Sequence, residues 1–119
     1  MKKFTFILFI SIIPFFVSCE EEVEGIVKVQ NKVHNVKLEQ IMWNGRQLTY
    51  SLLPGETSAE VFFTDYNEFF PKTDIVEFYM AANGKRVFLK TRQSYTLNAG
   101  GELTIVISDD TEVVNPMTE

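Results

Sequence analysis

The sequence of 119 residues contains only one cysteine, Cys19, and only one histidine, His34. A single cysteine cannot form an internal disulfide, so no covalent cross-link holds the fold. One histidine and one cysteine cannot supply the usual ligands of zinc, and His34 lies in a turn-like segment, Asn31 to Asn35, with no nucleophile motif nearby. We therefore expect no metal, no cofactor and no catalytic triad, and we interpret His34 as a solvated loop residue.

Positive charge is also in the minority, with 11 Lys and Arg against 16 Asp and Glu and a formal net charge of −5. Affinity for nucleic acid depends on clustered positive charge, so we expect no nucleic-acid partner. The acidic run Asp109-Asp110-Thr111-Glu112 lacks the spacing and the glycine of an EF-hand loop, and no glycine-rich phosphate loop occurs. A glycosidase needs two carboxylates across a cleft, which a domain of this size rarely builds, so an enzyme is the least favoured function.

The first 18 residues are typical of a secretory signal peptide. A charged start, Met1-Lys2-Lys3, precedes an apolar run from Phe4 to Val17. The run is 14 residues long, whereas a membrane-spanning helix needs about 20, so we expect residues 1–18 to be removed. Of the 119 residues, 101 then remain, enough for one domain with a core. Because two lysines leave with the signal, 9 Lys and Arg face 16 Asp and Glu, a net charge of −7.

The peptide Phe16-Val17-Ser18-Cys19 resembles the lipobox of bacterial lipoproteins, in which a small residue precedes a cysteine that is diacylated on its sulfur and becomes the new N-terminus. Ser18 and Cys19 match that pattern, and Phe16 departs from it because an aliphatic residue is usual there. The resemblance implies a membrane anchor, since each buried methylene of an acyl chain contributes about 0.8 kcal/mol. The alternative for Cys19 is a free thiol or one half of an intermolecular disulfide.

Acidic residues follow the cysteine directly, namely Glu20, Glu21, Glu22 and Glu24. We expect residues 19–25 to form a lipidated, solvated acidic tether, which would span about 20 Å if extended. The acidic run resembles the signal that directs lipoproteins of Bacteroidetes-type bacteria to the cell surface, and the alternative is a charged spacer. The expected location is therefore the outer membrane, facing either the surface or the periplasm.

The rest of the sequence is rich in Val, Ile, Phe, Thr and Tyr, with Gly, Asn and Pro between the apolar runs, which is typical of an all-β fold. Asn44-Gly45 and Asn83-Gly84 predict type I′ hairpin turns, because both central residues of that turn need φ > 0. Leu53-Pro54-Gly55-Glu56 fits a type II turn. These signals predict an antiparallel two-sheet sandwich over residues 26–110 and a tail over 111–119. We predict seven strands, near residues 25–30, 36–43, 46–53, 59–64, 75–82, 85–92 and 102–108.

The tight turn at Asn83-Gly84 fixes the register of the second hairpin. On its outer face the register pairs Tyr79 with Phe88 and Glu77 with Lys90, and such cross-strand pairs contribute about 0.2–1 kcal/mol each. In the first hairpin, polar and apolar residues are mixed on each face, so we expect a bulge or a sheet edge there. The core face of the second hairpin is predicted to carry Val76, Phe78, Met80, Val87 and Leu89, with Thr91 at its end.

Five aromatic residues lie within the nine residues from Phe62 to Phe70. Strand alternation sends Phe62 and Phe63 to opposite faces, so one core face cannot hold all five. We predict that Tyr66, Phe69 and Phe70 contact a protein partner or stack on sugar rings. The alternative is that these three rings plug the open end of the sandwich.

The outer face of the second hairpin is another candidate binding surface, because it combines cations with an aromatic ring. The alternative for this face is a solvated or sheet-covered surface with a purely structural role. Its candidate residues are Arg86, Phe88, Lys90 and Arg92.

Taken together, the signal, Cys19, the acidic tether and the hairpin-rich domain resemble the small β-sandwich lipoproteins of Bacteroidetes-type bacteria. The resemblance covers the whole chain, although only the lipobox is a specific motif, and it implies an immunoglobulin-like or related fold and no particular activity. We predict a lipid-anchored, non-catalytic binding or assembly module at the outer membrane or cell surface, which contacts the membrane through acyl groups on Cys19. The alternative is a glycan-binding accessory lipoprotein that uses the loop aromatics.

Overall fold

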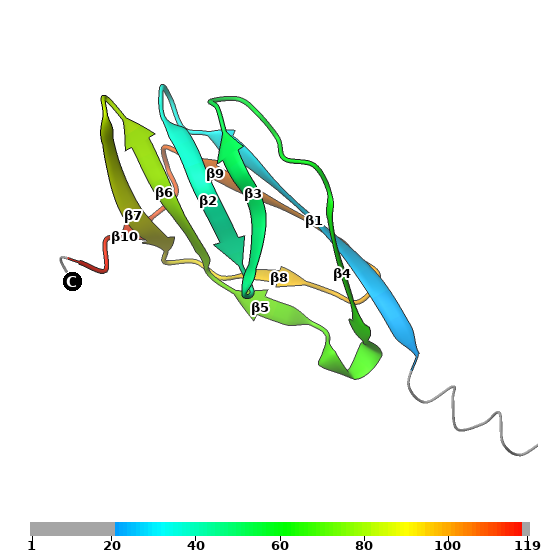
Figure 1. Cartoon of the computed structure of the whole chain (residues 1–119). Coiled ribbons are helices and arrows are strands. Elements are labelled where there is room, and N and C mark those ends of the chain that lie inside the picture. Colours follow the sequence, from blue (N-terminus) through cyan, green and yellow to red (C-terminus); the bar gives the residue numbers. More distant parts are fainter. Residues whose placement is uncertain (1–20, 118–119) are drawn as a thin grey trace, which may run out of the picture.

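A computed structural model describes residues 21–117 as an all-β fold, which confirms the predicted fold class (Figure 1). The predicted signal peptide and Cys19 lie outside the described residues. Besides one short 3-10 helix, η4 (Asn67–Phe69), the described elements are all strands. These are β1 (Glu22–Lys32), β2 (Lys37–Trp43), β3 (Arg46–Leu52), β4 (Val61–Tyr66), β5 (Lys72–Asp74), β6 (Val76–Ala82), β7 (Lys85–Thr91), β8 (Tyr95–Leu97), β9 (Glu102–Ser108) and β10 (Val113–Val114).

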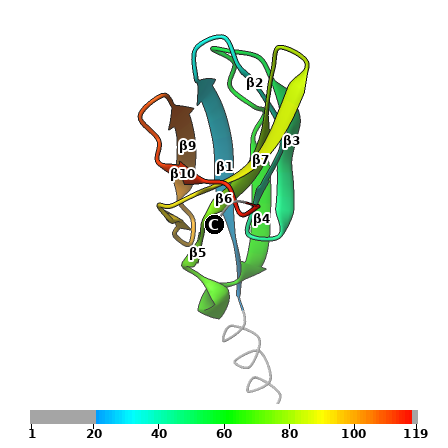
Figure 2. The ribbon, with the colours of Figure 1, turned by 90° about the vertical axis from the view of Figure 1, so that its left-hand side faces the viewer.

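Two larger sheets form the sandwich. One has three strands in the order β4-β1-β9, and the other has five in the order β10-β7-β6-β2-β3. Figure 2 shows β1 and β9 on one side of the sandwich and β2, β3, β6 and β7 on the other. A small sheet of β5 and β8 closes one end. The pairing of β1 with β9 is parallel, which departs from the antiparallel arrangement predicted for the whole domain.

The second hairpin has the predicted turn and register. Asn83 and Gly84 have φ values of 54° and 76°, as a type I′ turn requires. The strands pair Glu77 with Lys90 and Tyr79 with Phe88. The prediction that Val87 is part of the core is wrong, because its side chain is 40% exposed. Val87 lies near the turn end of β7, at the edge of the five-stranded sheet beyond its pairing with β10, and the facing sheet has only three strands.

The first hairpin contains the predicted bulge. The pairing of β2 shifts between Glu39 and Met42 on its β6 side, and Gln40 has a φ of 47°. An extra residue in a strand reverses the alternation of side chains beyond it. This reversal brings both Leu38 and Ile41 to the core, and it explains why the sequence alone mixed polar and apolar residues on each face. The strand β3 is also the edge of its sheet.

Both large sheets contribute to one hydrophobic core. Trp43 of β2 and Phe63 of β4 meet edge to face across the sandwich, with their ring centroids 5.3 Å apart. The Trp43 indole also donates a hydrogen bond of 3.0 Å to the backbone carbonyl of Asp74. Trp43 therefore links the two large sheets to the small sheet of β5 and β8. The fully buried apolar side chains include Val27, Val29, Leu38, Ile41, Trp43, Val76, Phe78, Leu97, Ile105 and Ile107.

The domain extends beyond both predicted boundaries. The tether predicted over residues 19–25 overlaps with β1, which begins at Glu22 and pairs with β4. The tail predicted over 111–119 contains β10, which pairs with β7. Both segments are short or charged, so their strand character depends on the neighbouring strand rather than on local sequence. The strands β5 and β8 were missed for the same reason.

We expect Phe78→Ala to lower the free energy of unfolding by about 3–5 kcal/mol, because the ring is fully buried and its loss leaves a cavity. Phe62→Ala is the matched control, since Phe62 is 47% exposed on β4, and it should cost much less. Chemical denaturation followed by the fluorescence of Trp43, the one tryptophan of the chain, measures both. Equal losses in the two variants would contradict the packing described above.

Candidate functional site

The predicted aromatic loop forms one end of the domain, where β4 runs into η4 (Figure 1). Tyr66 is 40% exposed and Phe69 is 53% exposed, and their ring centroids lie 6.4 Å apart. We call these two residues the aromatic tip. Two large rings held side by side in solvent make an exposed apolar patch of the kind that binding sites use, so they remain a candidate contact surface.

The aromatic tip is fixed to the first strand of the domain. Tyr66 lies opposite Glu22 in the pairing of β4 with β1. The backbone amide of Asn67 donates a hydrogen bond of 3.2 Å to the carbonyl of Glu21, and the amide of Phe70 donates one of 3.1 Å to Asn67. The turn that carries both rings is therefore held against the N-terminal end of β1.

Phe70, the third predicted contact residue, lies differently from the other two. It is partly buried and packs against the core. The Lys72 ammonium group lies 5.1 Å from the centre of this ring and donates a hydrogen bond of 2.9 Å to Asp65. That hydrogen bond, together with one from the Tyr66 amide, lowers the pKa of the Asp65 carboxyl below its ordinary value. Phe70 thus supports the aromatic tip from within.

The second candidate surface is the outer face of the five-stranded sheet. Phe88 packs against Tyr79 with ring centroids 5.1 Å apart, and Lys90 lies 3.4 Å from the Glu77 carboxylate. Arg86 lies 4.0 Å above the centre of the Tyr79 ring. Arg92 follows β7 and is exposed, and its backbone amide donates a hydrogen bond of 3.0 Å to Glu112. These residues belong to β7 and its end, so the structure does not join them with the aromatic tip in one site.

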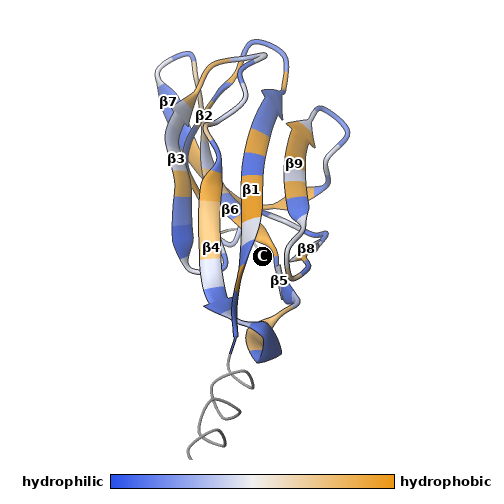
Figure 3. Cartoon of the chain, turned by 90° about the vertical axis from the view of Figure 1, so that its right-hand side faces the viewer, coloured by the Kyte–Doolittle hydropathy of each residue, from blue (hydrophilic) through white to orange (hydrophobic). Residues whose placement is uncertain are grey.

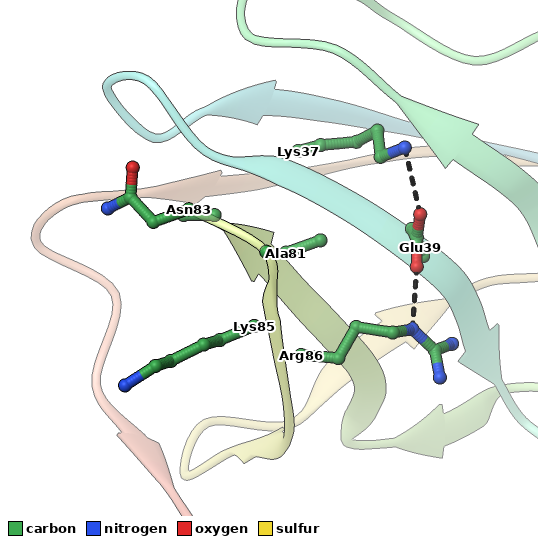
Figure 4. A pocket seen from close by; sticks show the side chains of 8 residues that line it. Lys37, Glu39, Ala81, Asn83, Lys85 and Arg86 are labelled. Carbon is green, nitrogen blue, oxygen red and sulfur yellow. Dashed lines mark hydrogen bonds and ion pairs between the residues drawn. The ribbon is translucent and has the colours of Figure 1, made fainter.

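A hollow of about 360 Å³ lies at the β6–β7 hairpin (Figure 4). Glu39 lies at one side of it, and its carboxylate forms ion pairs with Lys37 at 3.0 Å and with Arg86 at 2.7 Å. The hydrogen bond from Lys37, and after it that from Arg86, lowers the pKa of Glu39 below its ordinary value of 4.5. The cations on this face are therefore largely matched by carboxylates, and the surface is not a simple basic patch. Lys37 and Glu39 were not predicted, because their position depends on how β2 pairs with β6.

The single histidine, His34, joins the loop after β1 to the loop after β9, at the opposite end of the domain from the aromatic tip. His34 Nδ1 lies 2.5 Å from a carboxylate oxygen of Asp109, and the His34 amide donates a hydrogen bond of 3.1 Å to the other oxygen. These bonds lower the pKa of the Asp109 carboxyl. Asp109 also borders an apolar crevice of about 210 Å³, lined by residues such as Phe78, Ile107 and Val113. The histidine ring is 85% exposed, as expected of a solvated loop residue.

Comparison with protein-family models, with curated proteins and with solved structures finds no match to this chain. Within residues 21–117, no helix is long and apolar enough to span a membrane. Across the same described range, His, Asp and Glu side chains form no group of three or more that could hold a metal ion.

We expect the ion pairs of Glu39 to make stability depend on pH. Because the pKa of Glu39 is lowered in the folded state, the stabilisation is present above the ordinary value of 4.5 and is lost as the pH falls through the lowered value. Glu39→Gln should therefore lower the melting temperature near neutral pH, and this deficit should shrink as the pH falls below 4.5 and the carboxyl becomes protonated. Glu60→Gln, at an exposed position before β4, controls for the loss of one carboxylate. A deficit in Glu39→Gln that persists unchanged at low pH would contradict this account.

Proposed function

We propose that this chain is a lipid-anchored, non-catalytic binding or assembly module of the outer membrane. The observation that carries the proposal is the junction of Ser18 with Cys19 after a short apolar run. The place of the folded domain supports it, because β1 begins at Glu22, directly after the expected anchor. The domain then faces either the cell surface or the periplasm.

The described surface supports binding rather than catalysis. On the outer face of the five-stranded sheet, Phe88 packs against Tyr79, and Arg86 is stacked on Tyr79 and paired with Glu39. Aromatic and arginine side chains are the kinds that protein interfaces use. His34 is engaged by Asp109 at the surface, in a pair that joins two loops. A protein partner is therefore the better supported ligand.

The glycan-binding alternative has weaker support. Sugar rings stack on broad, accessible aromatic faces. Tyr66 and Phe69 are tilted by 44° to each other, so they do not form one flat platform. The third ring of the loop, Phe70, packs against the core.

We expect Cys19→Ser to abolish acyl labelling of the protein and to move it from the membrane to the soluble fraction. The reason is that a hydroxyl cannot replace the thiol to which the lipid would be joined. Ser18→Ala is the matched control, because it keeps a small residue before the cysteine and should leave labelling and membrane retention intact. Labelling with a radioactive or clickable fatty acid, followed by membrane fractionation, measures both effects. Acyl labelling that persists in Cys19→Ser would refute the anchor.

We expect the detergent-extracted protein to co-purify with a protein partner, which Arg86→Ala or Phe88→Ala should weaken if the outer face of the sheet contacts it. Val106→Ala, at an exposed position on the opposite sheet, is the control. Quantitative mass spectrometry and carbohydrate analysis of the eluate measure the outcome. A polysaccharide in the eluate would favour the glycan alternative, and an eluate that contains only this chain would contradict the binding proposal.

A further inference from the structure

The aromatic tip lies where the chain enters the domain. Figures 1 and 2 both show η4 and the N-terminal end of β1 at the same end of the sandwich. The Asn67 amide donates to the Glu21 carbonyl, and Tyr66 lies opposite Glu22. The first described residues of the chain are thus direct neighbours of the two exposed rings.

The chain between Cys19 and this end is very short. Three residue steps separate Cys19 from Glu22, and a fully extended chain covers at most about 3.6 Å per step, or about 11 Å in total. A tether that ended at Gly25, as the sequence suggested, would have allowed about twice that reach. A lipid on Cys19 would therefore keep the aromatic tip close to the membrane whatever path the tether takes.

We propose that the aromatic tip rests on the lipid surface in which Cys19 is anchored and that it orients the domain there. This inference rests on the proposed acylation of Cys19. Tyrosine and phenylalanine suit such a position, because their rings enter the boundary between head groups and acyl chains, and the tyrosine hydroxyl stays hydrated. The acyl chains supply the free energy of attachment, so the two rings need only select one orientation of a domain that is already held at the surface.

The charges around the aromatic tip specify the lipid. Glu21, Glu22 and Glu68 are exposed near the two rings, whereas the nearby Lys72 is paired with Asp65. Carboxylates at this end are repelled by anionic head groups, since a negative surface attracts only basic segments. The surface that fits is a zwitterionic one, such as phosphatidylethanolamine or phosphatidylcholine.

This orientation decides which surfaces remain open to a partner. The turn at Pro54-Gly55 is joined by backbone hydrogen bonds to Asn31, near the far end of β1. The turn between β6 and β7 also lies at this far end (Figure 1), and its residues Asn83 and Gly84 line the hollow described above. Figure 3 shows the outer face of β4, β1 and β9, where polar and apolar positions alternate along β1. With the aromatic tip on the membrane, the far-end loops point away from it, and both sheet faces stand free.

The test uses the full chain, produced with its own leader, extracted in detergent and reconstituted into phosphatidylcholine vesicles. Cys19 is the only cysteine, so a cysteine introduced by Glu68→Cys in η4, or by Lys85→Cys at the far end, takes one nitroxide spin label when Cys19 is acylated. We expect the label at position 68 to be shielded from a water-soluble nickel chelate and relaxed by lipid-soluble oxygen. The label at position 85 should show the reverse.

Two double variants test the rings themselves. Adding Tyr66→Ala and Phe69→Ala should abolish the shielding at position 68 while the protein stays with the vesicles. The matched control adds Tyr50→Ala and Leu53→Ala, which also removes two exposed large side chains, 64% and 53% exposed, but from β3 and its turn. This control should leave the shielding intact. Far-ultraviolet circular dichroism should show both double variants folded, since all four side chains are exposed.

The outcomes separate the inference from the function on which it rests. A nitroxide on Cys19 of the parent chain would show a free thiol, and the anchor itself would fail. If the protein stays on the vesicles but the labels at positions 68 and 85 are equally accessible to the nickel chelate, the proposed orientation is wrong and the anchor still stands. Dipolar broadening between labels at position 68 would mean that a second copy covers the aromatic tip, which overturns the assignment to lipid. Replacing a third of the lipid with phosphatidylglycerol should weaken the shielding, and stronger shielding would overturn the choice of a zwitterionic surface.

Discussion

The buried side chain of Asn31 is the interaction on which the far end of the sandwich depends. Its amide nitrogen donates hydrogen bonds of 2.8 Å and 3.0 Å to the carbonyls of Val36 and Leu52, and its oxygen accepts one of 2.9 Å from the Val33 amide. Its backbone amide and carbonyl bond to the turn at Gly55-Glu56. A fully buried amide is tolerated only when its polar atoms are paired. Asn31 therefore fixes β1, the start of β2 and the end of β3 relative to each other.

The strand β1 carries this constraint to the other end of the molecule. It lies between β4 and β9 in its sheet, and its core side holds Val27 and Val29, both fully buried. At its beginning, Gly25 leaves room for Leu97, because a Cβ atom there would lie 2.9 Å or less from three atoms of that side chain. The chain thus enters the fold on the central strand of its sheet. Because packed interiors are rigid, a restraint on the position of residue 21 would also restrain the rest of the sandwich.

The parts of the fold that local sequence determines were predictable, and those that depend on distant neighbours were not. The turns at Asn83-Gly84 and Asn44-Gly45 follow from the backbone angles that these residues accept. The parallel neighbour of β1 and the three short strands β5, β8 and β10 arise only when the chain has folded back on itself. In the candidate site, the surplus of aromatics could be read from alternation, which predicted that some rings leave the core. The position of Tyr66 opposite Glu22 could not be predicted, because it depends on the pairing of β4 with β1.

The acidic residues after Cys19 have two physical roles if that cysteine is acylated. Glu20 and Glu21 form the link, and Glu22 already belongs to a strand, so the negative charge stays within about 11 Å of the anchor. At that distance, near one Debye length in physiological salt, carboxylates still sense the charge of the lipid surface. The two exposed rings and the carboxylates then act in opposite directions, the rings favouring contact and the carboxylates excluding anionic lipid. With Cys19 acylated, the short tether would keep this end of the sandwich near the bilayer. The balance between the rings and the carboxylates would then decide whether the rings touch the lipid surface.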